Sequence, residues 1–117
     1  MPLPSPIPEQ LATLIARRFR VIGEPMRIRL LDHLRQSEAS VSQLTDALDT
    51  TQQNVSKHLN MLLEAGIVGR RKDGNHAYYR IVDDSVFDLC EQVCGSVQRQ
   101  IAELDQILER TMTGEDT

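Results

Sequence analysis

Hydrophobic positions recur every three or four residues along the first half of the chain, the spacing of one face of an α-helix. The pattern predicts an amphipathic helix over about residues 9–21. A second helix begins at Pro25, because proline suits the first turn, where its missing N–H costs no hydrogen bond. Ser40 and Gln43 have the spacing of a capping box, so they predict the start of a third, short helix.

A fourth helix is predicted from the N-cap Thr51 to about Ala65. Gly66 follows where a glycine commonly ends a helix. The apolar positions of this segment fall on one side of the helix, which we expect to be buried: Val55, Leu59, Leu62 and Leu63.

The period of the pattern then changes to that of strands. Residues 67–72 and 76–82 are rich in β-branched and aromatic side chains. Asp73 and Gly74 lie between the two runs and predict a β-hairpin with a type I′ turn, since glycine tolerates the positive φ angle that this turn requires.

A last, long helix is predicted over residues 85–112. Its apolar positions are spaced alternately by four and three residues, which suits a seam against another helix. These positions are Cys90, Cys94, Val97, Ile101, Leu104 and Leu108. Residues 1–8 form a proline-rich extended arm, and we expect residues 113–117 to be a frayed tail.

The composition is that of one globular domain, over residues 9–112 of the 117. Aromatic residues make up only 3%, so a core of leucine, isoleucine and valine in packed helices is favoured over a β-sandwich. A domain of this size folds without a metal or other cofactor. We find no membrane-spanning window and no secretory signal at the start, and therefore expect a cytoplasmic protein without a membrane partner.

The charge is distributed unevenly along the chain. The net charge is −4 at pH 7. Residues 1–50 have a net charge of zero, residues 51–80 have a net charge of +3, and residues 83–117 have a net charge of −7. A nucleic-acid contact therefore belongs in the middle third.

Two short helices joined at Asp49 and Thr50, followed by a basic hairpin, have the order of a winged helix-turn-helix. In that motif the second helix enters the major groove of DNA with its N-terminal residues at the base edges. Glutamine can pair with adenine, serine can contact bases or phosphate, and lysine binds phosphate. The polar face opposite the apolar stripe consists of Gln52, Gln53, Ser56, Lys57 and Asn60.

The hairpin would lie along the neighbouring DNA backbone or minor groove. Its candidate contacts are Arg70, Arg71, Lys72, Asn75 and His76. Each feature alone is typical of a solvated surface, but their order within about 40 residues favours DNA binding.

Three separated motifs resemble the ArsR/SmtB-type family of bacterial transcriptional regulators. They are Gly23-Glu-Pro-Met-Arg-Ile-Arg-Leu-Leu31, then Val55-Ser-Lys-His-Leu59 with Ala65-Gly-Ile-Val68, and Gly74-Asn-His-Ala-Tyr-Tyr-Arg80. The match covers about residues 10–110.

The resemblance implies a mainly α-helical winged helix-turn-helix fold with a small β-hairpin. It also implies a homodimer through the first and last helices that binds a palindromic operator in double-stranded DNA, usually as a repressor released by an effector. It adds His58 to the DNA-contacting residues, and the alternative is that His58 packs within the helix-turn-helix. We expect the dimer interface to contain Leu11, Ile15, Cys94, Val97, Ile101, Leu104 and Leu108.

The length of the last helix also favours dimerisation. A helix of about 28 residues spans about 42 Å, which is more than a domain of this size can cover alone. Two-fold pairing would place the two DNA-reading helices about 34 Å apart, one turn of DNA.

Many members of the family sense metals, metalloids or thiol-reactive species. Two sets of metal-binding residues found in such relatives are absent from this sequence. The third helix lacks Cys and His. On the last helix Asp83 keeps its place, but Ser85, Ser96 and Arg99 replace the histidines and the acid, which removes a zinc site of that type.

Cys90 and Cys94 remain as candidate metal ligands. At positions i and i+4 they share a helical face, as a two-thiolate chelate requires, and thiolates favour thiophilic metals and arsenite. Three interpretations stay open: buried packing residues, a thiolate-bound metal or metalloid effector, and an oxidant sensor.

No sequence motif of an enzyme is present. The alternative to a DNA-binding regulator is a winged-helix module for protein–protein interaction that lacks an effector site. It would differ from the regulator in having little salt-dependent affinity for DNA.

Overall fold

The computed structural model describes residues 2–114, which divide into two compact units, residues 2–83 and 84–114. The first unit contains four helices: α1 (Glu9–Ile22), α2 (Pro25–Leu34), α3 (Val41–Leu48) and α4 (Gln52–Glu64). It also contains three strands: β1 (Ala39–Ser40), β2 (Val68–Asp73) and β3 (His76–Ile81). The second unit is the helix α5 (Ser85–Thr113). Residues 2–8 form neither helix nor strand.

The predicted helix caps are confirmed at α3 and α4. The backbone N–H of Gln43 donates to the Ser40 hydroxyl over 3.2 Å, and the N–H of Ser40 donates to the Gln43 side chain over 2.9 Å, a complete capping box. At α4 the Thr51 hydroxyl accepts from the N–H of Asn54 over 3.1 Å. Asp49 links the two helices in the left-handed conformation, with φ of 50°.

The sheet has one strand more than the pattern predicts. All three strands are antiparallel in the order β1-β3-β2, with Ala39 opposite Tyr79. The two residues of β1 are too few to show a strand's alternation of polar and apolar positions, so only the contact with β3 reveals it.

The hairpin turn lies one residue later than predicted. Asp73 still pairs with His76, so the two loop residues are Gly74 and Asn75 rather than Asp73 and Gly74. Gly74 has φ of 63°, whereas Asn75 is not among the described residues with positive φ. A positive φ at the first position alone is typical of a type II′ turn, so the predicted type I′ turn is wrong.

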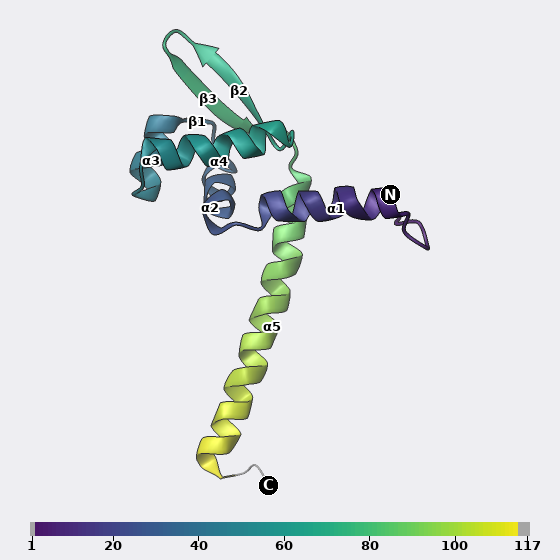
Figure 1. Ribbon diagram of the computed structural model, residues 1–117. Helices are drawn as coiled ribbons and strands as arrows, with labels where there is room; N and C mark the ends of the chain where they lie inside the picture. Colours follow the sequence, from purple (N-terminus) through teal and green to yellow (C-terminus); the bar gives the residue numbers. More distant parts are fainter. Residues whose placement is uncertain (1, 115–117) are drawn as a thin grey trace. The chain divides into compact units, whose positions relative to one another are not determined.

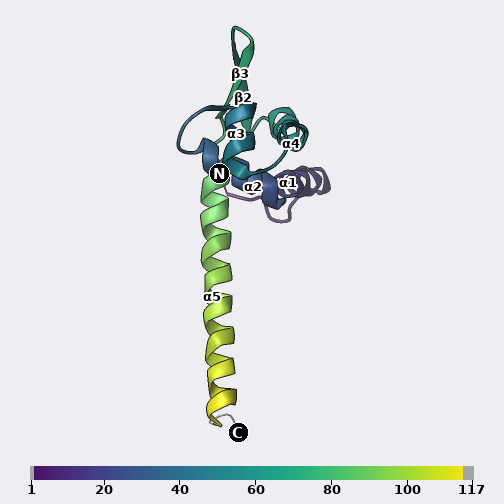
Figure 2. The same cartoon turned by 90° about the vertical axis from the view of Figure 1, so that its left-hand side faces the viewer.

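The core of the first unit is aliphatic. Its fully buried side chains come from three helices and from the segment that enters β2: Leu30, Leu31, Leu44, Val55, Leu59, Leu62, Ile67 and Val68. Figure 1 shows α4 beside α2 and α3, with the β2–β3 hairpin extending away from these helices. Figure 2 shows the same hairpin from a second direction, again projecting beyond α3 and α4.

The helix α5 is continuous for 29 residues and ends at Thr113, with Gly114 as its C-cap at φ of 73°. It therefore includes Thr113, which the pattern assigns to a frayed tail, and residues 115–117 of that tail lie outside the described residues.

Candidate nucleic-acid interface

The helix α4 has one buried face and one polar face. Val55, Leu59 and Leu62 are each 0% exposed. On the other side the side chains of Gln52, Gln53, Lys57 and Asn60 are exposed, and Ser56 is half-buried. The structure therefore brings all five polar residues of the predicted face together on one accessible surface.

The polar surface begins at the N-terminus of α4. The first N–H groups of any α-helix lack partners inside the helix and attract negative charge. In α4 the Thr51 hydroxyl accepts one of them, and Thr50 accepts a hydrogen bond from the Asn54 side chain over 3.0 Å. The side chains of Gln52 and Gln53 project from this ordered turn.

His58 is the one predicted α4 contact that the geometry does not place on the accessible surface. Its side chain is 8% exposed, and its Nδ1 lies 3.0 Å from Nη1 of Arg27 and 3.6 Å from Oε2 of Glu24. A ring enclosed in this way cannot reach a DNA groove while the fold is intact. The prediction of a DNA contact is therefore corrected in favour of the packing alternative.

The surroundings of His58 oppose its protonation. Burial lowers the pKa of this imidazole below its ordinary value. The carboxylate of Glu24 raises the pKa, but the positive charges of Arg27 and Lys57 lower it further. Since Arg27 can only donate hydrogen bonds, Nδ1 accepts and the ring proton lies on Nε2.

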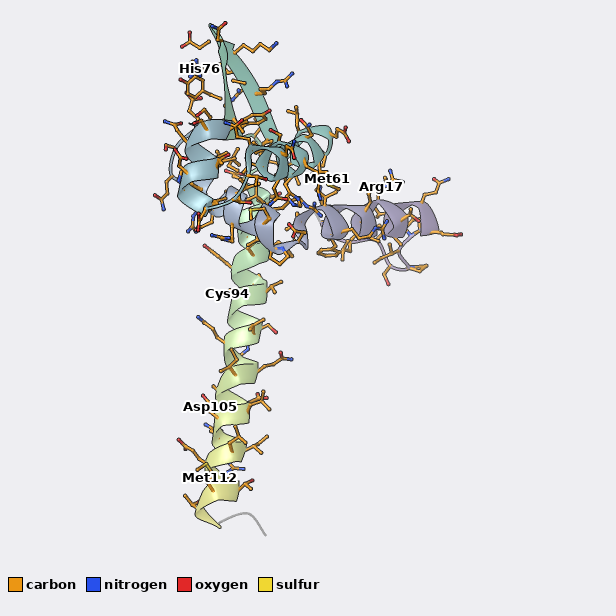
Figure 3. The ribbon with its side chains drawn as sticks, turned by 60° about the vertical axis from the view of Figure 1, so that its left-hand side comes forward. Arg17, Met61, His76, Cys94, Asp105 and Met112 are labelled. Atoms are coloured by element: carbon orange, nitrogen blue, oxygen red, sulfur yellow. The ribbon has the colours of Figure 1, made fainter. Side chains whose placement is uncertain are left out.

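The hairpin carries its basic side chains on two faces. Successive residues of a strand point to opposite sides, so Arg70 and Lys72 share one side of β2 and Arg71 lies on the other. The side chains of Arg70, Arg71, Lys72, Asn75 and His76 are exposed. Figure 3 shows His76 on the hairpin.

Arg71 is engaged within the protein. Its guanidinium forms an ion pair with Glu38, lies 4.9 Å from the centre of the Tyr78 ring and is 3.7 Å from Asp73. The hydrogen bond from Arg71 lowers the pKa of the exposed Glu38 carboxyl below its ordinary value. Arg71 therefore ties the hairpin to the segment before β1 and shares its charge with that carboxylate.

The cysteines lie on α5. Cys90 is half-buried and Cys94 is exposed, and neither forms a disulfide within the described part of the chain. Figure 3 shows Cys94 in the first half of α5. Residues 2–114 of one chain bring together no group of three or more His, Cys, Asp and Glu side chains that could hold a metal.

The predicted interface positions on α5 form an exposed apolar row. Val97 is 45% exposed, Ile101 53%, Leu104 58% and Leu108 59%. On α1 the side chains of Leu11 and Ile15 are half-buried.

Two residues with clear structural roles were missed by the sequence reasoning, Arg27 and Glu38. A charged residue at a helical position that the fold buries gives no distinctive signal in the pattern. Glu38 is exposed, and its partner lies 33 residues further along the chain.

The family model for a helix-turn-helix domain matches residues 22–71. The biofilm growth-associated repressor of Agrobacterium fabrum is 36% identical over 89 residues, which are 76% of each chain. The transcriptional repressor SmtB of Mycobacterium tuberculosis is 35% identical over 80 residues, 68% of this chain and 59% of SmtB.

A solved structure shares the architecture. The homodimeric winged helix-turn-helix DNA-binding domain of a possible ArsR-family transcriptional regulator from Mycobacterium bovis aligns with a TM-score of 0.69 and 26% identity. The alignment covers 80% of this chain and 87% of that one. The chain belongs to the ArsR/SmtB-type family of transcriptional regulators.

Membership of the ArsR/SmtB-type family confirms the predicted winged helix-turn-helix fold and the prediction that the protein is not an enzyme, because its relatives are DNA-binding repressors. Among helices in residues 2–114, none has the combined length and apolar character required for a membrane crossing.

Proposed function

We propose that this chain is a dimeric repressor that binds a palindromic DNA operator with α4 in the major groove. The observation that carries the proposal is the division of α4 into a fully buried apolar face and an accessible polar face. A helix held by three completely buried side chains is fixed on the protein body, so its polar face is presented in one orientation.

The polar face contains the chemistry for reading bases. Gln52 and Gln53 carry amides that match the donor and acceptor pattern of adenine in the major groove. Ser56 and Asn60 lie farther along the same face and can donate or accept hydrogen bonds. These four residues are the proposed source of sequence preference.

Phosphate contacts would come from the borders of this face. Lys57 lies beside the glutamines on α4, and the hairpin presents Lys72, Asn75 and His76 on exposed positions. Arg71 would contribute when a phosphate competes with Glu38 for its guanidinium.

A second copy of the chain is the proposed partner of the apolar row on α5. A helix whose exposed residues include Val97, Ile101, Leu104 and Leu108 lacks a partner surface among the described residues of one chain. The similar domain of Mycobacterium bovis is homodimeric. Pairing of α5 and α1 with the same helices of a second copy would present two α4 helices to one operator.

Salt dependence and base preference together test the DNA-binding proposal. An operator selected from random double-stranded DNA should bind with log K falling against log[salt] by about 0.9 for each phosphate neutralised. Gln53→Ala should reduce the preference for the operator over scrambled DNA, whereas Lys72→Ala should weaken binding to both alike. A flat salt response with no selected sequence contradicts the proposal and favours a protein–protein interaction module.

We further propose that Cys90 and Cys94 form an effector site for a thiophilic metal, a metalloid or an oxidant. Their spacing places both thiols on one face of α5, and Cys94 is accessible. Since one chain supplies only these two thiols, a complete metal coordination shell would need the second copy.

Operator release, titrated with zinc, cadmium, arsenite and peroxide, tests the effector site. The double variant Cys90→Ser with Cys94→Ser should bind the operator as the wild type does but fail to release it. If the wild type and the double variant release the operator at the same effector concentration, the two thiols are packing residues and form no effector site.

A further inference from the structure

Arg27 is a buried cation at the junction of three helices. It lies in the first turn of α2, and only 7% of its surface is exposed. Its guanidinium donates to the backbone carbonyls of Arg20, over 3.2 Å, and Val21, both in the last turn of α1. The same group lies 3.0 Å from His58 and 3.1 Å from the Met61 sulfur, both on α4.

Through these contacts Arg27 connects the C-terminal end of α1 to the side of α4. The last carbonyls of α1 lack partners inside their own helix, and Arg27 satisfies two of them. His58 and Met61 lie one turn apart along α4, on the flank between its buried and its polar face. Figure 3 shows Met61 on the part of α4 near α1.

Burial of the Arg27 charge is unfavourable for stability alone, so its hydrogen bonds indicate a structural role. A buried charge loses the solvation of water, and apolar residues of similar size would often give equal or greater stability. The hydrogen bonds of the Arg27 guanidinium go to neutral acceptors, whereas the Glu24 carboxylate accepts from the backbone N–H of Arg27. Such directional bonds fix the distance and orientation between the groups that they join. Here these groups are the C-terminal end of α1 and the side of α4 that carries His58 and Met61.

We propose that Arg27 is a positioning residue for DNA binding, which holds α4 at a fixed angle to α1 through His58 and Met61. The inference rests on the proposed function. If two copies pair through α1, the angle between α1 and α4 in each copy sets the separation and direction of the two α4 helices. Arg27 would then control how well both helices fit one operator, while it touches no DNA.

Binding to a complete operator and to a single half-site separates positioning from a merely structural role. Arg27→Met removes the hydrogen bonds and keeps an unbranched apolar side chain. Arg17→Met is the matched control, since Arg17 is an exposed arginine on α1. Both variants are compared at a temperature where circular dichroism shows each to be fully folded.

We expect Arg27→Met to weaken binding to the complete operator about tenfold relative to Arg17→Met, with a much smaller change for a half-site. A general loss of folded protein would lower both affinities by the same factor. Equal affinity of the two variants for the complete operator would overturn the proposal.

Substitution at His58 gives a second, independent comparison. His58→Asn keeps an acceptor near the place of Nδ1 and should retain operator affinity close to that of the wild type. His58→Leu removes the acceptor and should reproduce the loss seen in Arg27→Met. Equal operator affinity of the folded Asn and Leu variants would overturn the proposal even if Arg27→Met does not fold.

Operator binding by the wild type distinguishes failure of the proposed function from failure of the positioning role. If it binds no selected DNA sequence, the proposed function fails. If it binds an operator and the variants do not differ, only the positioning role of Arg27 fails.

Discussion

The ion pair of Arg71 with Glu38, beside a weaker one with Asp73, should reduce the affinity of this exposed arginine for phosphate. The guanidinium of Arg71 faces the Glu38 carboxylate and the Tyr78 ring, whereas Lys72, its neighbour on β2, forms no ion pair within residues 2–114. In the proposed complex, a DNA phosphate would have to compete with Glu38 for Arg71 but would reach Lys72 without such competition. The two cations should therefore contribute differently to DNA affinity.

Removing the Glu38 charge should strengthen DNA binding. In Glu38→Gln, Arg71 loses its ion pair with residue 38 and keeps only Asp73 as a charged partner, and a negative charge beside the proposed DNA surface is lost, so we expect several-fold higher operator affinity. The slope of log K against log[salt] should steepen by up to about 0.9, the value for one more phosphate contact. Glu109→Gln on α5 is the control with the same change in net charge, and a result equal to this control would contradict the competition between Glu38 and phosphate.

The buried His58 should make stability depend on pH. Its pKa is lowered in the folded protein, so between that value and about 6.5 the unfolded chain binds a proton that the folded protein does not. The free energy of unfolding should therefore fall as the pH decreases through this window. Above the window, His58 should make no contribution to the pH dependence. Urea unfolding at a series of pH values should show a smaller dependence for His58→Asn.

His76→Asn, at an exposed position, is the control for that series. If it removes as much of the pH dependence as His58→Asn does, the buried imidazole is not the source.

At the level of helices and strands, local signals account for most of what the sequence predicts correctly. The caps at Ser40 and Thr51 depend on neighbours three residues away, so the pattern alone locates α3 and α4. By contrast, β1 exists only through its pairing with β3, and the buried pair of Arg27 and His58 joins residues 31 positions apart. Contacts between distant segments leave no periodic signal in the sequence. The polar face of α4 was therefore predictable, whereas the choice between a DNA contact and packing at His58 was not.

Loss of the α3 cap should cost stability without altering the core. Ser40→Ala removes the acceptor for the N–H of Gln43, and we expect the free energy of unfolding to fall by about 1 kcal/mol. Ser42→Ala, on the exposed side of α3, should change it by less than about 0.5 kcal/mol. Urea denaturation measures both, and equal effects would show that the capping box does not stabilise the protein.

For the molecule as a whole, the exposed apolar row of α5 is the main indication that one chain is incomplete. A 29-residue helix with Leu104 58% exposed and Leu108 59% exposed offers a long surface for a second copy. The heptad-like spacing predicted this row, because it is a property of one helix. Whether Cys90 and Cys94 bind a metal could not be predicted in the same way, since two thiols are too few to form a complete coordination shell within one chain.

A charge placed in this row should separate the copies. Leu104→Asp would bury an unpaired carboxylate at the interface, so we expect a monomer at micromolar concentration in sedimentation experiments where the wild type is a dimer. Gln106→Asp, two residues away on another side of α5, should remain a dimer. A wild type that sediments as a monomer under these conditions would contradict the proposed pairing.

The spacing of operator half-sites tests the central claim most directly, namely that two α4 helices of a symmetric dimer read one DNA face. Five base pairs inserted between the half-sites of the selected operator rotate one half-site by about half a turn of DNA. We predict that affinity then falls to that of a single half-site and recovers partly when the insertion is extended to ten base pairs. Affinity that is indifferent to the five-base-pair insertion would contradict the account.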